Sequence, residues 1–398
     1  MRVKLAGRWG YINKEGTPVS LTRNIPQDNI LGNYTDSIHG EGLFKRGLTV
    51  TAVCTSCHTS HFVLPHTDPR SSIAKVQPVT PMINNMDAPD HTRLRAEFRK
   101  AFAAPEVAKL EPMIRRIAKE RLAACLEAGR MDVIHDYSAH VAVTVACTIS
   151  GLPAEDGPFL NALVWRFFQR EEGVRGMTEA GLAALGEMFA YFHDQIARRR
   201  RGTAKDDVLQ KLLEFEQGGR RLDDDALASH LSMLIIGGSE TFPKTLATIV
   251  RRLAQHPDQR QMCVDDPGLI PDAYNEGLRY DMPTQFLMRQ VKRPVEFAGA
   301  RMEPGQNLMF LYHSGNHDER EFPFPSRFDI RRRPPRILSF GYGPHSCLGV
   351  NVARLEGRVC LEELLARVPA YQVDEVGAER LRTEYVQGYW KLPITFSA

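Results

Sequence analysis

Apolar residues recur three and four positions apart over most of the middle of the chain, a spacing that places them on one face of an α-helix. Several of these segments open with an acidic residue or proline, as helices commonly do. The predicted helices cover 91–104, 105–128, 132–151, 158–170, 178–201, 205–216, 223–256 and 268–280. The strand-like segments are short and cover 48–53, 286–290, 294–297, 307–312 and a C-terminal pair near 383–396. The pattern predicts a mainly α fold with a minor β region.

The chain has 398 residues but contains no stretch rich in Pro, Ser or Gly that would act as a linker, no low-complexity tract and no repeat. We therefore expect a single domain over residues 1–398. Its helix-rich parts would span 87–280 and 340–370, and its small β regions would span 48–65, 286–312 and 383–396.

Charge and hydropathy exclude some classes of function. The formal net charge is +3, which is too balanced for a protein whose main partner is nucleic acid. No apolar stretch is long enough to span a bilayer, and the N-terminus lacks a signal-peptide core. The seven cysteines are scattered and do not form a disulfide framework. We expect a cytoplasmic protein, monomeric and without a membrane anchor.

The stretch FGYGPHSCLG, residues 340–349, surrounds Cys347 with the residues that a haem-thiolate centre requires. A thiolate bound to haem iron favours cleavage of the O–O bond. Gly341 and Gly343 allow backbone conformations in which N–H groups approach the sulfur. Phe340 would shield the sulfur from water, and Gly349 would let the next helix begin close to the porphyrin. The alternative is a glycine-rich loop with a buried structural cysteine. The stretch resembles the F-G-x-G-x-H-x-C-x-G signature of the cytochrome P450 family.

Residues 234–243, LIIGGSETFP, interrupt the longest apolar helical run with two glycines, an acid, an alcohol and a proline. Pro243 cannot donate to the carbonyl of Ser239, so we expect a bend with an opening beside Glu240 and Thr241 that could hold water or dioxygen. The segment resembles the distal helix of the family, which implies that Glu240 and Thr241 relay protons to dioxygen and that the acid is linked to bulk water. The alternative is a kinked core helix whose threonine bonds to its own backbone.

Glu276 and Arg279 lie three apart on a predicted helix, where an exposed pair would contribute little. The pair resembles the E-x-x-R motif of the family. With Arg327 of the segment PSRF, the resemblance implies a buried Glu276, Arg279 and Arg327 network that locks the cysteine loop. Breaking such a network should cost several kcal/mol.

His91 and Arg95 lie four apart at the start of a predicted helix and would face the same way. The segment resembles a helix of the family that binds haem, and a buried haem needs cationic or N–H partners for its two propionates. His91, Arg95, Arg289 and His345 are the expected ligands. Without a haem, the same pair would be a surface pair on an amphipathic helix.

A second string, CTSCH at residues 54–58, matches the pattern for covalent attachment of a c-type haem, and His61 adds a possible metal ligand. We discount it because that attachment accompanies export and no export signal is visible.

The resemblance implies the triangular P450 fold with haem b between the distal and proximal helices. It implies a monooxygenase that inserts one atom of O2 into a hydrophobic small molecule. Because no flavin or iron–sulfur segment is present, electrons would come from a ferredoxin or flavodoxin with its NAD(P)H reductase. The acidic partner would dock on a basic face around Arg93, Lys100 and Arg354.

Two alternatives stay open, a peroxide-using haem-thiolate peroxygenase and a non-catalytic haem sensor or carrier. The intact Glu240–Thr241 pair argues against both. A terpenoid, fatty acid, steroid or aromatic substrate would suit the mostly apolar pocket that the resemblance implies, although ordinary core is the alternative for these positions. The expected pocket residues are Met82, Asn84, Asn85, Phe168, Ile236, Gly237, Gln285, Leu287 and Tyr389, of which the two asparagines and the glutamine could orient a polar group.

Overall fold

The computed structural model describes residues 82–171, 177–297, 299–381, 383 and 386–397, together with the backbone of three N-terminal strands. The chain divides into two compact units, Met1–Lys75 and Val76–Ala398. In the first unit, β1 (Arg2–Leu5), β2 (Arg8–Ile12) and β3 (Pro18–Val19) form an antiparallel sheet in that order. The predicted β region 48–65 and the string Cys54–His58 lie outside the described residues. The single domain over 1–398 stays a prediction.

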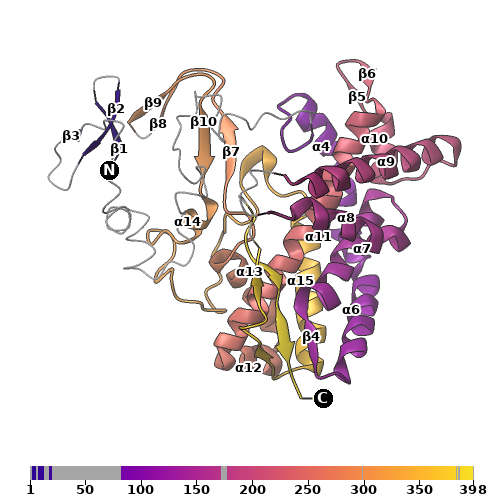
Figure 1. The fold of residues 1–398 in the computed structure, drawn as a ribbon, viewed down its shortest axis with the longest axis vertical. Coiled ribbons are helices and arrows are strands. Elements are labelled where there is room, and N and C mark those ends of the chain that lie inside the picture. The colour runs from indigo at the N-terminus through magenta and orange to yellow at the C-terminus, as the bar shows by residue number, and fades with distance from the viewer. Residues whose placement is uncertain are drawn as a thin grey trace. The chain divides into compact units, whose positions relative to one another are not determined.

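Helices form most of the second unit (Figure 1). They are α4 (Asp90–Ala101), α5 (Ala104–Ala108), α6 (Glu111–Leu126), α7 (Ala139–Ser150), α8 (Gly157–Phe168), α9 (Glu179–Arg201), α10 (Val208–Glu214), α11 (Asp224–Gln255), α12 (Pro257–Asp265), α13 (Ile270–Tyr280), α14 (Tyr312–Asn316) and α15 (Val350–Arg367). A π-helical segment (Val133–Ser138) precedes α7, and 3-10 turns cover Ala154–Asp156, Pro267–Leu269 and Gly343–His345. None of the described helices combines the length and apolar composition that crossing a membrane requires.

The long helices begin where their start signals predict. Asp223 accepts a hydrogen bond from the backbone N–H of Ala226 and caps α11, and Thr178 caps α9 in the same way. The predicted helix 105–128 is instead two helices, because Pro112 near the start of α6 has no N–H to continue the preceding turn. Helix α12 was not predicted because its sequence is largely polar and has little apolar periodicity.

The strands of the second unit form small antiparallel sheets. The three-stranded sheet has the order β11 (Gln372–Val373), β14 (Pro393–Thr395), β4 (Arg130–Asp132). The paired strands are β7 (Leu287–Gln290) with β10 (Asn307–Phe310), β8 (Val295–Phe297) with β9 (Ala300–Met302), β12 (Glu379–Arg380) with β13 (Tyr389–Lys391), and β5 (Glu216–Gln217) with β6 (Arg220–Arg221). The two strands predicted near 383–396 are present as β13 and β14, and they bond to different neighbours.

Helices α11, α13 and α15 pack against one another at glycines. A Cβ added at Gly277 of α13 would lie 2.1 Å from Cγ1 of Ile249 on α11. A Cβ at Gly357 of α15 would lie 2.1 Å from a ring carbon of Tyr274 on α13. The backbones therefore approach more closely than larger residues would allow, which fixes the start of α15 relative to α11.

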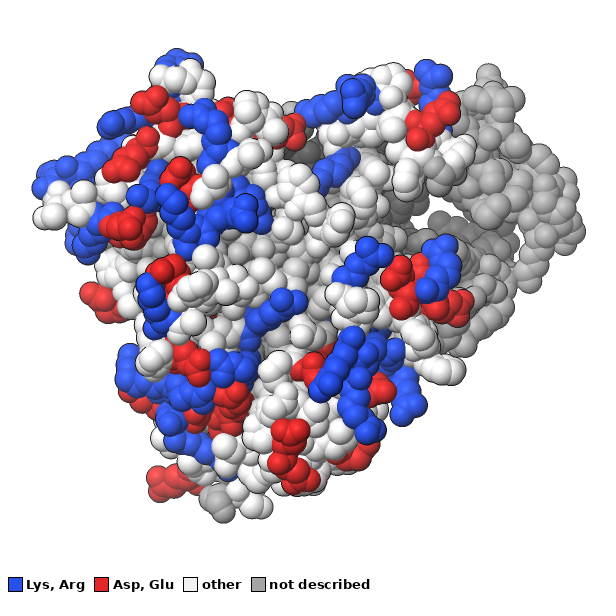
Figure 2. All heavy atoms as spheres, turned by 180° about the vertical axis from the view of Figure 1, so that it is seen from behind, with Lys and Arg blue, Asp and Glu red and all other residues white. Residues whose placement is uncertain are grey.

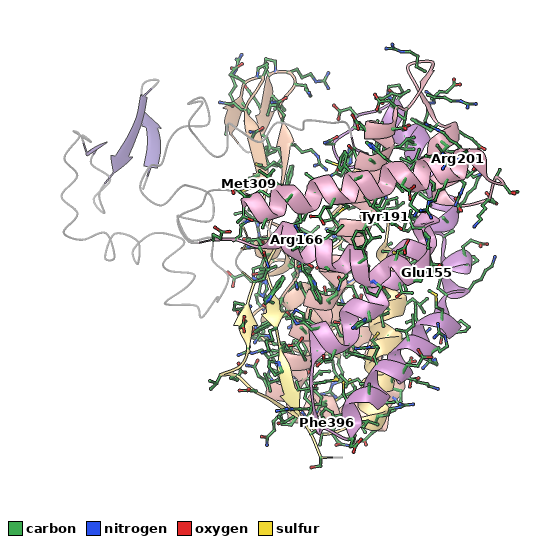
Figure 3. All side chains as sticks on the ribbon, turned by 45° about the vertical axis from the view of Figure 1, so that its right-hand side comes forward. Glu155, Arg166, Tyr191, Arg201, Met309 and Phe396 are labelled. Carbon is green, nitrogen blue, oxygen red and sulfur yellow. The ribbon has the colours of Figure 1, made fainter. Side chains whose placement is uncertain are left out.

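Helices α8 and α9 run side by side (Figure 3). Arg166 on α8 pairs with Glu187 on α9 at 2.9 Å, and the Tyr191 hydroxyl donates to Asp156 at 2.7 Å. Basic and acidic side chains alternate over the described surface in Figure 2, which agrees with the near-neutral net charge.

Candidate functional site

The loop before α15 holds Cys347 in a tight backbone frame. The N–H of Cys347 donates to the carbonyl of Phe340 at 2.7 Å, and the N–H of Ser346 donates to the carbonyl of Gly343 at 3.0 Å. Gly341 and Gly343 have φ values of +68° and +80°, in the left-handed region that favours glycine. The two glycines therefore adopt backbone conformations that other residues rarely reach, while the backbone N–H that bonds to the Cys347 sulfur is that of Gly349. Gly349 is the residue at which α15 begins.

Cys347 keeps an exposed surface, although protein atoms crowd its thiol from most directions. That burial raises the pKa of the thiol, while the backbone N–H of Gly349 and the charge of Arg95 lower it. Both opposing groups favour a thiolate. Among the described residues, no group of three or more His, Cys, Asp or Glu side chains is placed to hold a metal ion.

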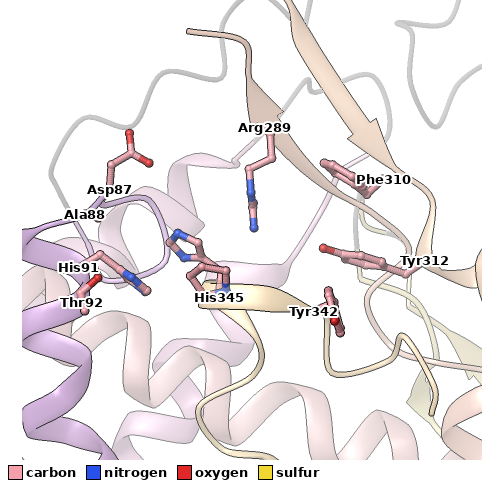
Figure 4. A pocket seen from close by; sticks show the side chains of 10 residues that line it. Asp87, Ala88, His91, Thr92, Arg289, Phe310, Tyr312, Tyr342 and His345 are labelled. Carbon is pink, nitrogen blue, oxygen red and sulfur yellow. The ribbon is translucent and has the colours of Figure 1, made fainter. Parts of the chain in front are cut away.

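A cavity of about 430 Å³ opens beside the cysteine loop (Figure 4). Its charged lining consists of Arg289 from β7, His91 from α4, His345 from the loop and one carboxylate, Asp87. In Figure 4 the Arg289 guanidinium points into this space. The further lining residues are Ala88, Thr92, Phe310, Tyr312, Tyr342 and Pro344. A cavity with this composition suits an anionic group held against apolar walls.

The rings of His91 and His345 stack with their centroids 4.0 Å apart. Burial and nearby arginines lower the pKa of His91, and burial together with the charge of His91 and Arg289 lowers the pKa of His345. His91 is buried, and its Nε2 has no hydrogen-bond partner among the described residues. Such an atom is costly unless a ligand satisfies it. Arg95 does not line the cavity and donates instead to the Ser346 carbonyl at 2.6 Å.

In its central turns, helix α11 is half-buried along one broad face, which includes Leu234, Ile236 and Gly238. Met233, Gly237 and Thr241 are half-buried and four residues apart, so they lie on one face, while the residues from Phe242 to Val250 are buried. The Thr241 hydroxyl donates to the Gly237 carbonyl at 2.9 Å. This is the bond of the alternative interpretation, and it leaves the hydroxyl oxygen able to accept. The helix is assigned without interruption across Pro243, so the predicted opening is limited to the missing donor to Ser239.

The expectation that Glu240 is linked to bulk water is not met directly. Its side chain is 1% exposed and lies 3.1 Å from the ammonium of Lys244, which is equally buried. Burial raises the pKa of Glu240, and Lys244 and His135 oppose that rise. The sequence analysis missed Lys244, although an acid and a base four apart on one helix are a recognisable signal.

The network below the cysteine loop differs from the predicted one by one arginine. Arg279 binds Glu276 through two hydrogen bonds of 2.8 Å, and both side chains are buried. The second cation is Arg332, whose Nε lies 3.2 Å from Glu276. Arg327 was the wrong choice, since its side chain is exposed and it contributes only its carbonyl, at 2.7 Å from Arg332.

Asn316 joins this network to the cysteine loop. Its carbonyl accepts from Arg279 at 2.9 Å, and its side chain binds the N–H of Leu338 and the hydroxyl of Ser339. These are the two residues before Phe340. The network therefore holds the chain where the cysteine loop begins.

The structure separates the expected pocket residues into several groups. Ile236 and Gly237 lie on the half-buried face of α11, and Leu287 is exposed on β7. Asn85 accepts from the N–H of Met82 at 2.7 Å, in a turn where Asn84 is exposed, and Gln285 is half-buried. Phe168 and Tyr389 belong to the hydrophobic core, which corrects their prediction as pocket lining.

Comparisons with known proteins agree with the site. The family model for cytochrome P450 matches residues 269–373. A putative cytochrome P450 123 of Mycobacterium tuberculosis is 33% identical over 83% of this chain and 82% of that protein. The vitamin D(3) 25-hydroxylase of Pseudonocardia autotrophica is 34% identical over 79% of this chain and 78% of that protein. A solved structure of a mutant P450 EryK with erythromycin B superposes with a TM-score of 0.74 at 30% identity, covering 81% of this chain and 84% of that one.

The fold and the site define a haem-thiolate oxygenase. The chain belongs to the cytochrome P450 family. It is a monooxygenase that uses haem and O2 and acts on a hydrophobic small molecule with electrons from a redox partner. The predicted mainly α fold of this family is confirmed.

The described residues fit a haem. Cys347 offers a single thiol with an open side, and the cavity next to it offers the unpaired Nε2 of His91 and the guanidinium of Arg289. Thiolate on iron and cations on propionates are two kinds of contact by which a protein holds a haem.

Proposed function

We propose that Cys347 is the thiolate ligand of the haem and that His91, Arg289 and His345 bind its propionates. The observation that carries this assignment is the juxtaposition of the cysteine loop with a basic cavity whose buried His91 Nε2 has no protein partner. Arg95 would act mainly on the loop, through its bond to Ser346, and would favour the thiolate by its charge. Phe340 and Gly349 shape the approach to the sulfur.

The absorption spectrum of the reduced, carbon monoxide-bound protein tests this proposal. The wild type should show a strongly red-shifted Soret band, and Cys347→Ala should lose it. A band that does not respond to this substitution would mean that another residue binds the iron, and the string at Cys54–His58 would become the candidate haem site.

Bound haem supplies the activation of dioxygen, and we propose that Glu240 and Thr241 deliver the protons that this activation consumes. Thr241 lies on the only half-buried face of α11 within its described central turns, with its hydroxyl anchored to Gly237 and its oxygen free to accept a second bond. Glu240 precedes it as the buried acid. The intact pair supports a monooxygenase over a peroxygenase or a haem sensor.

Thr241→Ala should raise the share of electrons released as hydrogen peroxide several-fold. Ser239→Ala is the matched control, because its hydroxyl makes the same kind of bond to the carbonyl four residues earlier, at 2.6 Å, on a buried face. Equal peroxide release from both variants would contradict the assignment of Thr241.

The redox partner is proposed to be a ferredoxin or flavodoxin that docks on a basic surface. Arg93 and Lys100 are exposed on α4, and Arg354 on α15 lies 5.3 Å from the centre of the Phe340 ring, which connects this surface to the cysteine loop. Charge complementarity would accelerate association. Lys100→Glu should slow reduction by an acidic ferredoxin at low salt, whereas Arg116→Glu on α6 should not. We further propose a monomer that works in the cytoplasm, where the reductase finds its NAD(P)H.

The substrate is proposed to be an apolar small molecule that enters over the half-buried face of α11 at Ile236 and Gly237. Two relatives support a small-molecule substrate. One is named vitamin D(3) 25-hydroxylase, and the structure of a mutant P450 EryK contains erythromycin B. A spin-state shift of the haem on titration with terpenoids, fatty acids, steroids and aromatics would identify the class.

A further inference from the structure

Glu240 and Lys244 form a buried ion pair that has little other support. Their charged atoms lie 3.1 Å apart, and each side chain is 1% exposed. Among the described residues, no group forms a hydrogen bond of good geometry with either carboxylate oxygen of Glu240 or with the ammonium of Lys244. A buried ion pair of this kind is a weak source of stability compared with apolar packing. Its presence beside Thr241 therefore calls for another explanation than stability.

The ring of Trp390 covers the Lys244 end of the pair. The ammonium of Lys244 lies 5.2 Å from the ring centre of Trp390 on β13. Gly388, with φ of +134°, lets this strand pass so close that a Cβ there would lie 2.9 Å from Cβ of Lys244. The indole replaces polar partners with a π-face, which a cation tolerates in a site that excludes water.

His135 connects this covered pair to the surface. Its ring centroid lies 4.5 Å from that of Trp165 and 5.6 Å from that of Trp390. Its side chain is 26% exposed, and its Nδ1 lies 3.1 Å from Asp132. It is also the one titratable group besides Lys244 whose charge acts on Glu240 within the described residues.

Other charged groups around His135 belong to its own segment and to two helices. They are Asp132 and Asp136 on the same segment, His140 on α7 and Arg121 on α6. The pKa of Glu240 responds to the charges of Lys244 and His135. The route from water to the acid through described titratable groups therefore passes His135 and Lys244.

We infer that His135 is the residue at which protons are taken up from solvent for Glu240, with Lys244 as the intermediate group beside the indole of Trp390. Lys244 passes a proton to the carboxylate of Glu240, which gives it on toward Thr241. Lys244 then regains a proton from the imidazolium of His135, and His135 is recharged by water. The ring of Trp390 lies against both groups, with its centre 5.2 Å from the ammonium of Lys244 and 5.6 Å from the ring centre of His135. This inference rests on the proposed roles of Glu240 and Thr241.

His135→Gln in the haem-loaded protein tests the inference, with a surrogate ferredoxin and its reductase as electron source. Dioxygen consumption and peroxide release are measured, because neither needs a known substrate. Consumption should fall on the order of tenfold, and its solvent deuterium isotope effect should rise. The reduced carbon monoxide spectrum and the thermal midpoint should stay unchanged, which separates a proton role from a structural one.

The matched control is His193→Gln on α9. His193 also pairs with an aspartate, Asp225 at 3.0 Å, but lies on the surface away from the two indoles, so its loss should change nothing. Tryptophan emission gives a second readout without turnover, since a charged imidazole quenches a neighbouring indole. Its pH dependence should disappear in His135→Gln and be displaced in Lys244→Met.

The outcomes distinguish this inference from the function it rests on. Normal dioxygen consumption and isotope effect in His135→Gln, with elevated peroxide release in Thr241→Ala, would overturn the uptake route and leave the relay intact. Normal behaviour of Thr241→Ala would overturn the relay itself. A pH-dependent emission that is the same in Lys244→Met and wild type would also overturn the route, because Lys244 would then have no electrical contact with His135.

Discussion

Arg332→Gln should destabilise the protein by about 2–4 kcal/mol, whereas Arg327→Gln should change its stability by less than about 0.5 kcal/mol. The two arginines are five residues apart in the same loop, and the sequence motif favours Arg327. Only Arg332 has its side chain in the network, where it is 11% exposed and 3.2 Å from Glu276. The comparison therefore tests the structure against the motif.

The magnitude follows from what each partner of Arg332 loses. Its guanidinium donates to the carbonyls of Pro323 at 2.6 Å, Phe324 at 3.1 Å and Arg327 at 2.7 Å. Those residues are exposed, so water can replace most of these bonds. The larger loss is at buried Glu276. Removing the whole counter-charge from a buried ion costs about 3–5 kcal/mol. Arg279 remains bound to Glu276, so the expected cost is lower.

Urea unfolding of the haem-loaded protein, followed by the Soret band and by far-ultraviolet circular dichroism, measures the difference. A protein with a bound cofactor need not unfold in two states, so variants are compared by the shift of their midpoints. Haem release should begin at lower urea in Arg332→Gln, because the network anchors Asn316 and through it the cysteine loop. Equal midpoints for the two variants would refute the assignment of Arg332.

Two further sets of substitutions test the close packing of the helices and the buried His230. Gly277→Ala should lower the stability of the protein by about 1–3 kcal/mol, because its Cβ would collide with Ile249. Gly186→Ala on the exposed face of α9 should raise the stability by up to about 1 kcal/mol, because no atom lies within 4 Å of the added Cβ. Thermal midpoints of the two variants would show both effects. Burial lowers the pKa of His230 from 6.5 to about 4. Above pH 6.5 His230 is neutral in both the folded and the unfolded state. Between pH 6.5 and about pH 4 only the unfolded state binds the proton, so the free energy of unfolding decreases as the pH is lowered, by up to about 1.4 kcal/mol per pH unit. His230→Leu should flatten the unfolding free energy over this window in urea titrations, and an unchanged slope would contradict the argument.

The helical framework could be predicted because its signals are local. A long apolar periodicity and a capping aspartate define α11 to within a residue or so. Where the local sequence does not predict an element or its partner, contacts with residues distant in the sequence determine the structure. Helix α12 is polar along its length and is held by tertiary contacts, and the C-terminal strands bond to partners far away in the chain.

The site shows the same division. Gly341 and Gly343 were predictable because a positive φ leaves few other choices of residue. Arg332 was not, because the loop carries Arg327, Arg331, Arg332 and Arg333 within a few positions and only the folded loop decides which guanidinium reaches Glu276. Phe168 and Tyr389 were misplaced because an apolar side chain that lines a pocket and one that fills the core look alike in sequence.

The two buried ion pairs show how hydrogen bonding separates a structural pair from a functional one. Glu276 and Arg279 are three residues apart on α13, and their remaining capacity is filled by Arg332, the Asn316 carbonyl and the N–H of Asp329. Glu240 and Lys244 are four apart on α11 and equally buried, yet no described polar group completes their bonding. A fully satisfied pair resists any change of charge, because every partner would lose its bond. The pair beside the indole of Trp390 has fewer bonds to lose when a proton moves, and it lies next to Thr241, for which we propose a role in proton delivery.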